Sequence, residues 1–131
     1  SAHYYFRDFY GADSGMLAAM HVLAELGQSD TPLSAIASDY SPYVQSGEIN
    51  TRVGDPQVVV QTVADAFATK GSIDRLDGLS VHGPESGEDM WWFNVRASNT
   101  EPLLRLNVEA ATTSQLEKLT AEVLALINQG A

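Results

Sequence analysis

The sequence contains no cysteine, which excludes disulfide bonds and every zinc site built on thiolates. It also has no apolar run near the roughly 20 residues that a membrane-spanning helix needs, so we expect no membrane contact. Methionine is absent from its first position, and we interpret the chain as a fragment cut from a longer protein. These features are typical of a protein in the reducing cytoplasm, and we expect that localisation.

Basic residues are scarce. Seven Lys and Arg stand against seventeen Asp and Glu, which gives a formal net charge of −10. Binding to nucleic acid requires clustered cations that neutralise backbone phosphates, so we expect no nucleic-acid partner. A small anion can still bind where a few cations converge, because short charge-assisted hydrogen bonds outweigh a screened distant field. A hydrophobic content of 44% over 131 residues indicates a globular protein with a core.

Helical patterns occupy the first part of the chain. Apolar residues recur at helical spacing over residues 16–24, between a candidate N-cap at Asp13 and a candidate stop at Gly27. Pro32 predicts a second, short helix over about residues 33–38. The Ser41-Pro42 break then separates two predicted domains, residues 1–41 and residues 42–131.

The second domain reads as a mixture of strands and helices. Period-two alternation and turn residues predict strands at residues 43–53, 73–76, 79–82, 91–97 and 103–110. The Asp77-Gly78 dipeptide predicts a two-residue hairpin. One helix is predicted over residues 56–69 after an Asp55 cap, and a last one after a cap within residues 112–114. This order indicates an α+β fold, an antiparallel sheet with two helices on one face.

The turn between the two strongest strands carries the most chemistry. It reads Arg96-Ala97-Ser98-Asn99-Thr100-Glu101-Pro102, and Arg105 follows. Alternation places Arg96 and Arg105 on the same polar face, and the guanidinium fork of arginine suits a phosphate. Ser98 and Thr100 add hydroxyl donors, and Asn99 tolerates the positive φ that would turn successive N–H groups inward.

We interpret this turn as a site for a phosphate ester. An ordinary hairpin with surface arginines fits the same residues, and the residues alone leave both readings open. Glu101 would repel an anion, so we expect its side chain to turn away and either orient an arginine or accept from backbone N–H groups.

The segment from Arg96 to Ala110 resembles the phosphate-binding loop of the α-D-phosphohexomutases, especially their bacterial phosphomannomutase/phosphoglucomutase branch. The resemblance implies that residues 42–131 are the C-terminal domain of that family, with a fold related to the TATA-binding protein. Residues 1–41 would then be a helical remnant of the third, α/β domain. The phosphate ligands implied are Arg96, Ser98, Asn99 and Thr100, with Arg105 in the same cluster.

The start of the chain carries a second resemblance. Ser1-Ala2-His3 is similar to the end of the family's sugar-reading loop Gly-Glu-x-Ser-Gly-His, with Ala2 where glycine is common. By this match Ser1 would contact sugar hydroxyls, and His3 would be a candidate proton carrier in the catalytic cleft. A purely structural role for His3 remains open on the residues alone.

For the parent protein, the resemblance implies interconversion of hexose 1-phosphate and hexose 6-phosphate, with mannose and/or glucose as the sugar. The family uses a phosphoserine, a bisphosphorylated sugar intermediate and Mg²⁺ on an Asp-x-Asp-x-Asp loop. Neither the serine loop nor the acidic loop occurs in this sequence, so we expect no metal site and no mutase activity in this chain alone. The expected partners are a sugar phosphate and the remaining domains of the parent chain. The alternative is a non-catalytic α+β module that binds a metabolite or a protein.

Overall fold

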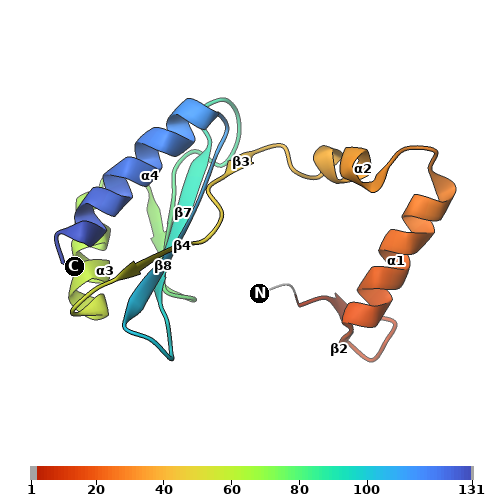
Figure 1. Ribbon diagram of the computed structural model, residues 1–131, viewed down its shortest axis with the longest axis horizontal. Coiled ribbons are helices and arrows are strands. Elements are labelled where there is room, and N and C mark those ends of the chain that lie inside the picture. The colour runs from red at the N-terminus through yellow and green to blue at the C-terminus, as the bar shows by residue number, and fades with distance from the viewer. Residues whose placement is uncertain (1–2, 131) are drawn as a thin grey trace. The chain divides into compact units, whose positions relative to one another are not determined.

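The computed structural model describes residues 3–130, and the chain divides into two compact units, residues 1–41 and residues 42–131 (Figure 1). Each unit is considered by itself. No helix within the described residues combines the length and the apolar character that crossing a bilayer demands.

The first unit holds a short hairpin and two helices. Strands β1 (Tyr5–Phe6) and β2 (Ala12–Asp13) pair antiparallel, and α1 (Gly15–Gln28) and α2 (Leu33–Asp39) follow. The cap predicted at Asp13 is wrong. Ser14 caps α1, and its hydroxyl accepts from the N–H of Leu17 at 3.2 Å. Asp13 lies in β2, and its carboxylate contacts His3 and the N–H of Tyr4 instead.

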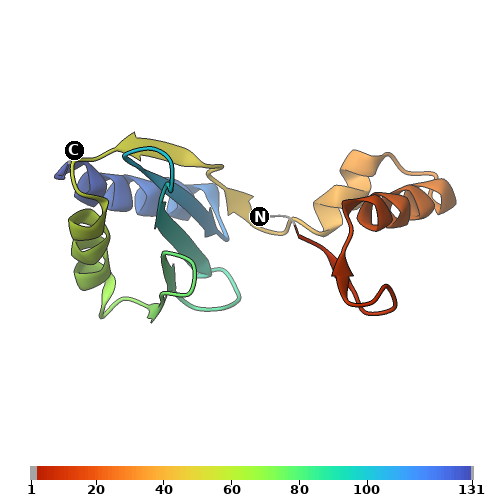
Figure 2. The same ribbon diagram turned by 90° about the horizontal axis from the view of Figure 1, so that it is seen from below.

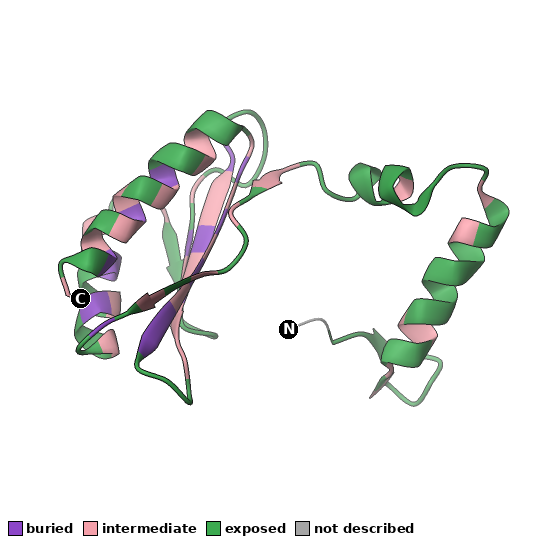
Figure 3. Ribbon diagram, in the orientation of Figure 1, coloured by how far each residue is buried: buried purple, intermediate pink, exposed green. Residues whose placement is uncertain are grey.

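The predicted apolar stripe of α1 is not buried within its own unit. Met16 is 80% exposed and Met20 57%, and neither α1 nor α2 contains a buried residue (Figure 3). The helical spacing therefore predicts the helix correctly without identifying what covers its apolar side.

The second unit contains the other eight elements. They are β3 (Val44–Gln45), β4 (Ile49–Arg52), α3 (Pro56–Phe67), β5 (Ser72–Asp74), β6 (Leu79–His82), β7 (Trp91–Ala97), β8 (Leu103–Ala110) and α4 (Thr113–Asn128). The sheet is antiparallel in the order β3-β8-β7-β6-β5, and β4 also pairs with β8. The predicted bounds of β7 and β8 are confirmed.

The strand predicted over residues 43–53 is in fact two strands. Gln45 pairs with Glu109 and Ile49 with Leu106, so three residues on one side face two on β8. This extra residue forms a β-bulge, and Gly47 supplies the positive φ of 67° within it. Period-two alternation cannot show such an insertion.

Helices α3 and α4 cover the same face of the sheet (Figure 2), as the sequence predicts. Asp55 caps α3 by accepting from the N–H of Gln57 at 3.0 Å. Thr112 caps α4 and forms a capping box with Gln115. The fully buried core side chains are Phe67, Phe93, Leu79, Leu104, Leu106, Ile127, Val63, Val81, Val95, Val108 and Val123.

The connection between β5 and β6 corrects another expectation. It comprises residues 75–78, not a two-residue turn, because β5 ends at Asp74. Gly78 has a φ of +76°, and a Cβ there would lie 2.7 Å from both Cβ of Arg96 and the carbonyl oxygen of Val95. Glycine is therefore required for this connection to pack against β7.

We predict that Phe93→Ala destabilises the second unit by about 3–5 kcal/mol, since it removes a fully buried ring from the core. The ring of Phe93 meets that of Phe67 edge-on, with centroids 4.9 Å apart, so this contact is lost as well. Urea unfolding followed by circular dichroism measures the change. Leu76→Ala, at a side chain that is 92% exposed, is the control and should shift stability by at most about 0.5 kcal/mol. Equal unfolding midpoints for the two variants would contradict this assignment of the core.

Candidate anion-binding site

Arg96 and Arg105 are direct cross-strand neighbours on β7 and β8. They lie on the polar face of the sheet, opposite the helices, because the alternating positions of both strands fill the core. Like charges placed directly opposite each other destabilise a sheet. Each side chain is only about one-third exposed, at 35% and 34%, so water screens the pair incompletely.

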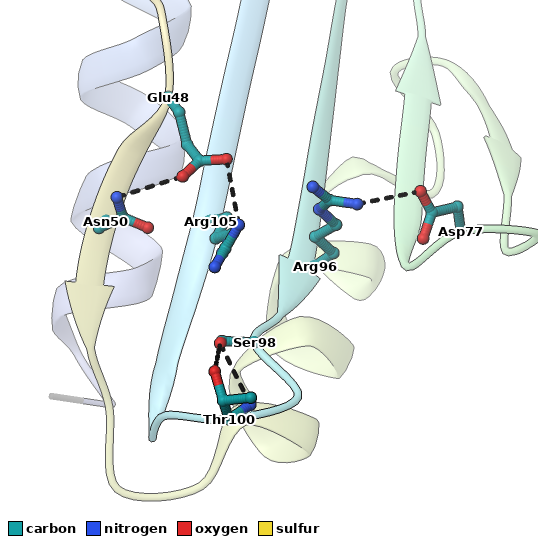
Figure 4. Close-up of polar contacts among 7 residues, drawn as sticks. All are labelled: Glu48, Asn50, Asp77, Arg96, Ser98, Thr100 and Arg105. Carbon is teal, nitrogen blue, oxygen red and sulfur yellow. Dashed lines mark hydrogen bonds and ion pairs between the residues drawn. The ribbon is translucent and has the colours of Figure 1, made fainter. Parts of the chain in front are cut away.

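A carboxylate on the outer side of each arginine offsets this repulsion (Figure 4). Asp77 Oδ2 lies 3.4 Å from Nη1 of Arg96, and Glu48 Oε2 lies 3.7 Å from Nη1 of Arg105. The side-chain amide of Asn50 donates to the other oxygen of Glu48 at 3.3 Å. Both ion pairs are long for charge-assisted hydrogen bonds, so the guanidinium groups retain donors for a further acceptor.

One arginine nitrogen is buried without a partner. Nε of Arg105 makes no hydrogen bond to any described residue, although solvent hardly reaches it. A buried donor left without an acceptor is costly, and native structures seldom contain one without a reason. An oxygen atom of a bound anion beside Arg105 would supply that acceptor.

The turn that follows β7 contributes hydroxyl and amide groups. The N–H of Ser98 donates to the carbonyl of Leu103 at 2.9 Å, which closes the turn. The hydroxyls of Ser98 and Thr100 lie 3.4 Å apart, and the N–H of Thr100 is also 3.4 Å from Oγ of Ser98 (Figure 4). These contacts exceed the usual hydrogen-bond length, so both hydroxyls are free to reorient toward a ligand.

One expectation for the turn is wrong, and another is confirmed. Tyr10 is the only non-glycine residue with a positive φ among residues 3–130, so Asn99 does not use the left-handed conformation. Glu101 turns toward an arginine, as expected; that arginine is Arg52, with 3.9 Å between Oε1 and Nη2. Both of these side chains are more than half exposed, and the contact is therefore weak.

Arg96, Arg105 and the turn residues Ser98, Asn99 and Thr100 line a pocket of about 610 Å³. Besides Arg96, Arg105 and the turn, its walls include Gln57, Val60, Arg75, Asp77, Gly78, Val95 and Ala97. The sequence analysis missed Arg75 and Gln57, which belong to a distant connection and to the first turn of α3. The hairpin pattern could have located Arg75. Because β6 runs antiparallel to β7, the connection that precedes β6 lies near the end of β7, where the turn begins.

In the first unit, His3 is paired with Asp13. Nδ1 of His3 lies 2.5 Å from Oδ2 of Asp13, and the N–H of Tyr4 donates to Oδ1 at 3.0 Å. The hydrogen bond from His3, followed by that from Tyr4, lowers the pKa of Asp13 below its ordinary value of 3.8. An ionised Asp13 can only accept a hydrogen bond, so this contact favours the tautomer of His3 that carries its proton on Nδ1. Ser1, the expected sugar contact, lies outside the described residues.

Within residues 3–130, no group of three or more His, Asp or Glu side chains could hold a metal ion.

Comparison with known protein families gives two matches along the chain. The model "Phosphoglucomutase/phosphomannomutase, C-terminal domain" matches residues 48–126. The model "Phosphoglucomutase/phosphomannomutase, alpha/beta/alpha domain III" matches residues 1–43.

Individual relatives agree with these matches. A phosphomannomutase of Salmonella montevideo is 42% identical over 135 residues, which cover 98% of this chain and 28% of the relative. A phosphomannomutase of Escherichia coli is 38% identical over 130 residues, and one of Methanocaldococcus jannaschii 35% over 127 residues. Both alignments cover 97% of this chain, which spans only 27% of the length of either relative.

A similar fold occurs in a crystal structure of a phosphoglucomutase/phosphomannomutase family protein from Burkholderia thailandensis. The TM-score is 0.72 at 22% sequence identity, over 98% of this chain and 26% of that chain. The α+β fold class predicted from the sequence is thereby confirmed.

We predict that His3→Ala raises the pKa of Asp13 toward its ordinary value, because the largest cause of the lowering is removed. A carboxyl group with a lowered pKa contributes stability above its unfolded pKa of about 3.9, and the contribution disappears as the pH falls through the folded pKa. The contact between Asp13 and Tyr4 should therefore persist at neutral pH and be lost in acid. A carbon-13 NMR titration of the Asp13 carboxyl measures both effects. His82→Ala is the control, and identical titrations for His3→Ala and wild type would contradict the prediction.

Proposed function

The chain belongs to the phosphoglucomutase/phosphomannomutase family, and on that premise we propose that it holds the substrate phosphate of a phosphohexomutase. The parent protein would interconvert hexose 1-phosphate and hexose 6-phosphate, with mannose and/or glucose as the sugar. The observation that carries the proposal is the direct cross-strand placement of Arg96 and Arg105 at the wall of a pocket.

A phosphate between the two arginines would replace repulsion by attraction. Its oxygens can accept from both guanidinium forks at once and can satisfy the buried Nε of Arg105. The hydroxyls of Ser98 and Thr100 would add two donors, and the exposed Asn99 amide a third. These five side chains are the proposed phosphate ligands.

The chemical role of this chain is orientation. Holding one phosphate of the sugar fixes the opposite end for reaction, and such positioning can lower a barrier by several kcal/mol. In the parent, a phosphoserine would give its phosphoryl group to the sugar, and the resulting bisphosphate would return the other phosphoryl group to the serine. Mg²⁺, whose ligands we place outside this chain, would supply charge stabilisation when bound.

His3 is the proposed proton carrier for the parent reaction. Asp13 holds its Nδ1, so Nε2 can take a proton from a sugar hydroxyl or return one. The contact of Ser1 with the sugar hydroxyls stays a prediction.

A direct test uses this chain and inorganic phosphate. We predict that phosphate binds weakly to the wild-type chain and that Arg96→Ala weakens binding at least about tenfold, the loss expected for a hydrogen bond to a charged group. Phosphorus-31 NMR titration at constant ionic strength measures the affinity. Lys118→Ala removes the same charge from an exposed position on α4 and is the matched control. Equal affinities for the Arg96 and Lys118 variants would refute the site.

In the full-length parent, Arg96→Ala should lower kcat/KM for the sugar phosphate about ten- to a hundredfold. The loss arises because the substrate is no longer held while its other end reacts. A coupled assay for hexose 6-phosphate formation measures the rate. Parent-like turnover by the variant would show that the phosphate is held elsewhere.

This chain by itself should have no mutase activity, since the nucleophile and metal ligands of the proposed mechanism lie outside it. The purified 131-residue chain is incubated with mannose 1-phosphate and the products are followed by phosphorus-31 NMR. Formation of mannose 6-phosphate by the chain, at a level above a mock purification, would overturn the prediction.

A further inference from the structure

We propose that Arg75 is a third arginine ligand for the phosphate in this pocket, and the one whose charge no carboxylate within residues 3–130 pairs with. The inference rests on the proposed function and extends it to a residue in the connection between β5 and β6. Arg75 lines the same pocket as Arg96 and Arg105.

The connection that carries Arg75 is fixed against β7. The side-chain amide of Asn94 donates to the carbonyl of Asp77 at 2.8 Å, and Asp77 also forms the ion pair with Arg96. The N–H of Leu76 donates to Oδ1 of Asp74 at 3.0 Å, and Gly78 packs directly on Arg96. The end of this connection, two to three residues after Arg75, is therefore held against Arg96, and Arg75 reaches the pocket from a different hairpin.

Helix α3 orients the guanidinium group of Arg75. Its Nη2 donates to Oε1 of Gln61 at 3.1 Å, and Nε2 of Gln61 donates to Oδ1 of Asp65 at 2.7 Å. Because Asp65 can only accept, it fixes the oxygen of the Gln61 amide toward Arg75. Gln57, one helical turn before Gln61, also lines the pocket, which therefore reaches from the polar face of the sheet to α3 on the other face.

The charges around the pocket distinguish Arg75 from the other two arginines. Arg96 is paired with Asp77 and Arg105 with Glu48, so these four groups sum to zero. Among residues 3–130, Arg75 forms no ion pair and bonds to a neutral amide. Its charge is therefore the surplus that can attract an anion to a chain whose net charge is −10.

Gln61 is the residue that positions the guanidinium group of Arg75. A carboxylate in its place would neutralise Arg75 as Asp77 and Glu48 neutralise the other two arginines. The neutral amide instead orients the guanidinium group and leaves its charge available for a ligand.

The test measures the affinity of the 131-residue chain for inorganic phosphate by phosphorus-31 NMR at constant ionic strength. Arg75→Ala should weaken binding about three- to fivefold, the upper part of the range for one charged contact at an exposed position. Lys118→Ala, the matched charge control, should leave the affinity within about twofold, because a distant exposed charge is screened.

Gln61→Glu supplies an independent test that keeps Arg75 in place. It should weaken phosphate binding in the wild-type background and have little effect in the Arg75→Ala background, since its effect acts through Arg75. Equal weakening in both backgrounds would indicate general charge repulsion and would overturn the inference.

The outcomes separate the inference from the function on which it rests. If Arg96→Ala abolishes binding while Arg75→Ala matches Lys118→Ala, Arg75 is not a ligand and the proposed function stands. If neither arginine variant differs from Lys118→Ala, both proposals fail. Weakening by Arg96→Ala and Arg75→Ala, with Gln61→Glu dependent on Arg75, supports both.

Discussion

The opposition of two positive charges across neighbouring strands organises the polar side of this molecule. Arg96 and Arg105 can remain side by side only because a carboxylate flanks each of them. Glu48 comes from the bulge between β3 and β4, and Asp77 from the connection between β5 and β6. A bulged strand on one side and the β5–β6 hairpin on the other are thus committed to one arginine pair. An isolated β7–β8 hairpin would carry the repulsion without its compensation.

The hydrophobic core makes this arrangement possible. Phe93 and Val95 on β7 and Leu104 and Leu106 on β8 are buried under the two helices. Burial of that face fixes the register, since a shift of one residue would send every one of these side chains to solvent and both arginines into the core. The same burial that stabilises the fold therefore holds the two charges together.

The two units differ in how completely they satisfy their own apolar residues. Residues 42–131 bury a continuous core, whereas α1 in the first unit keeps Met16 and Met20 exposed. The relatives that match this chain are nearly four times its length, as the 27% coverage implies. The pocket beside Arg96 is the part of the proposed activity that this chain carries by itself.

Alternation and capping residues in the sequence determined β7, β8, both core helices and the shared face of Arg96 and Arg105, because each depends on neighbours within a few residues. The sequence did not reveal the bulge at Gly47, the longer connection before β6 or the exposed side of α1. Nor did it identify Arg75 and Gln57 at the pocket, or the pairing of Glu48 with Arg105. Those features depend on which strands become neighbours and which helix packs over them. Only the three-dimensional packing brings residues so distant in the chain within hydrogen-bonding reach.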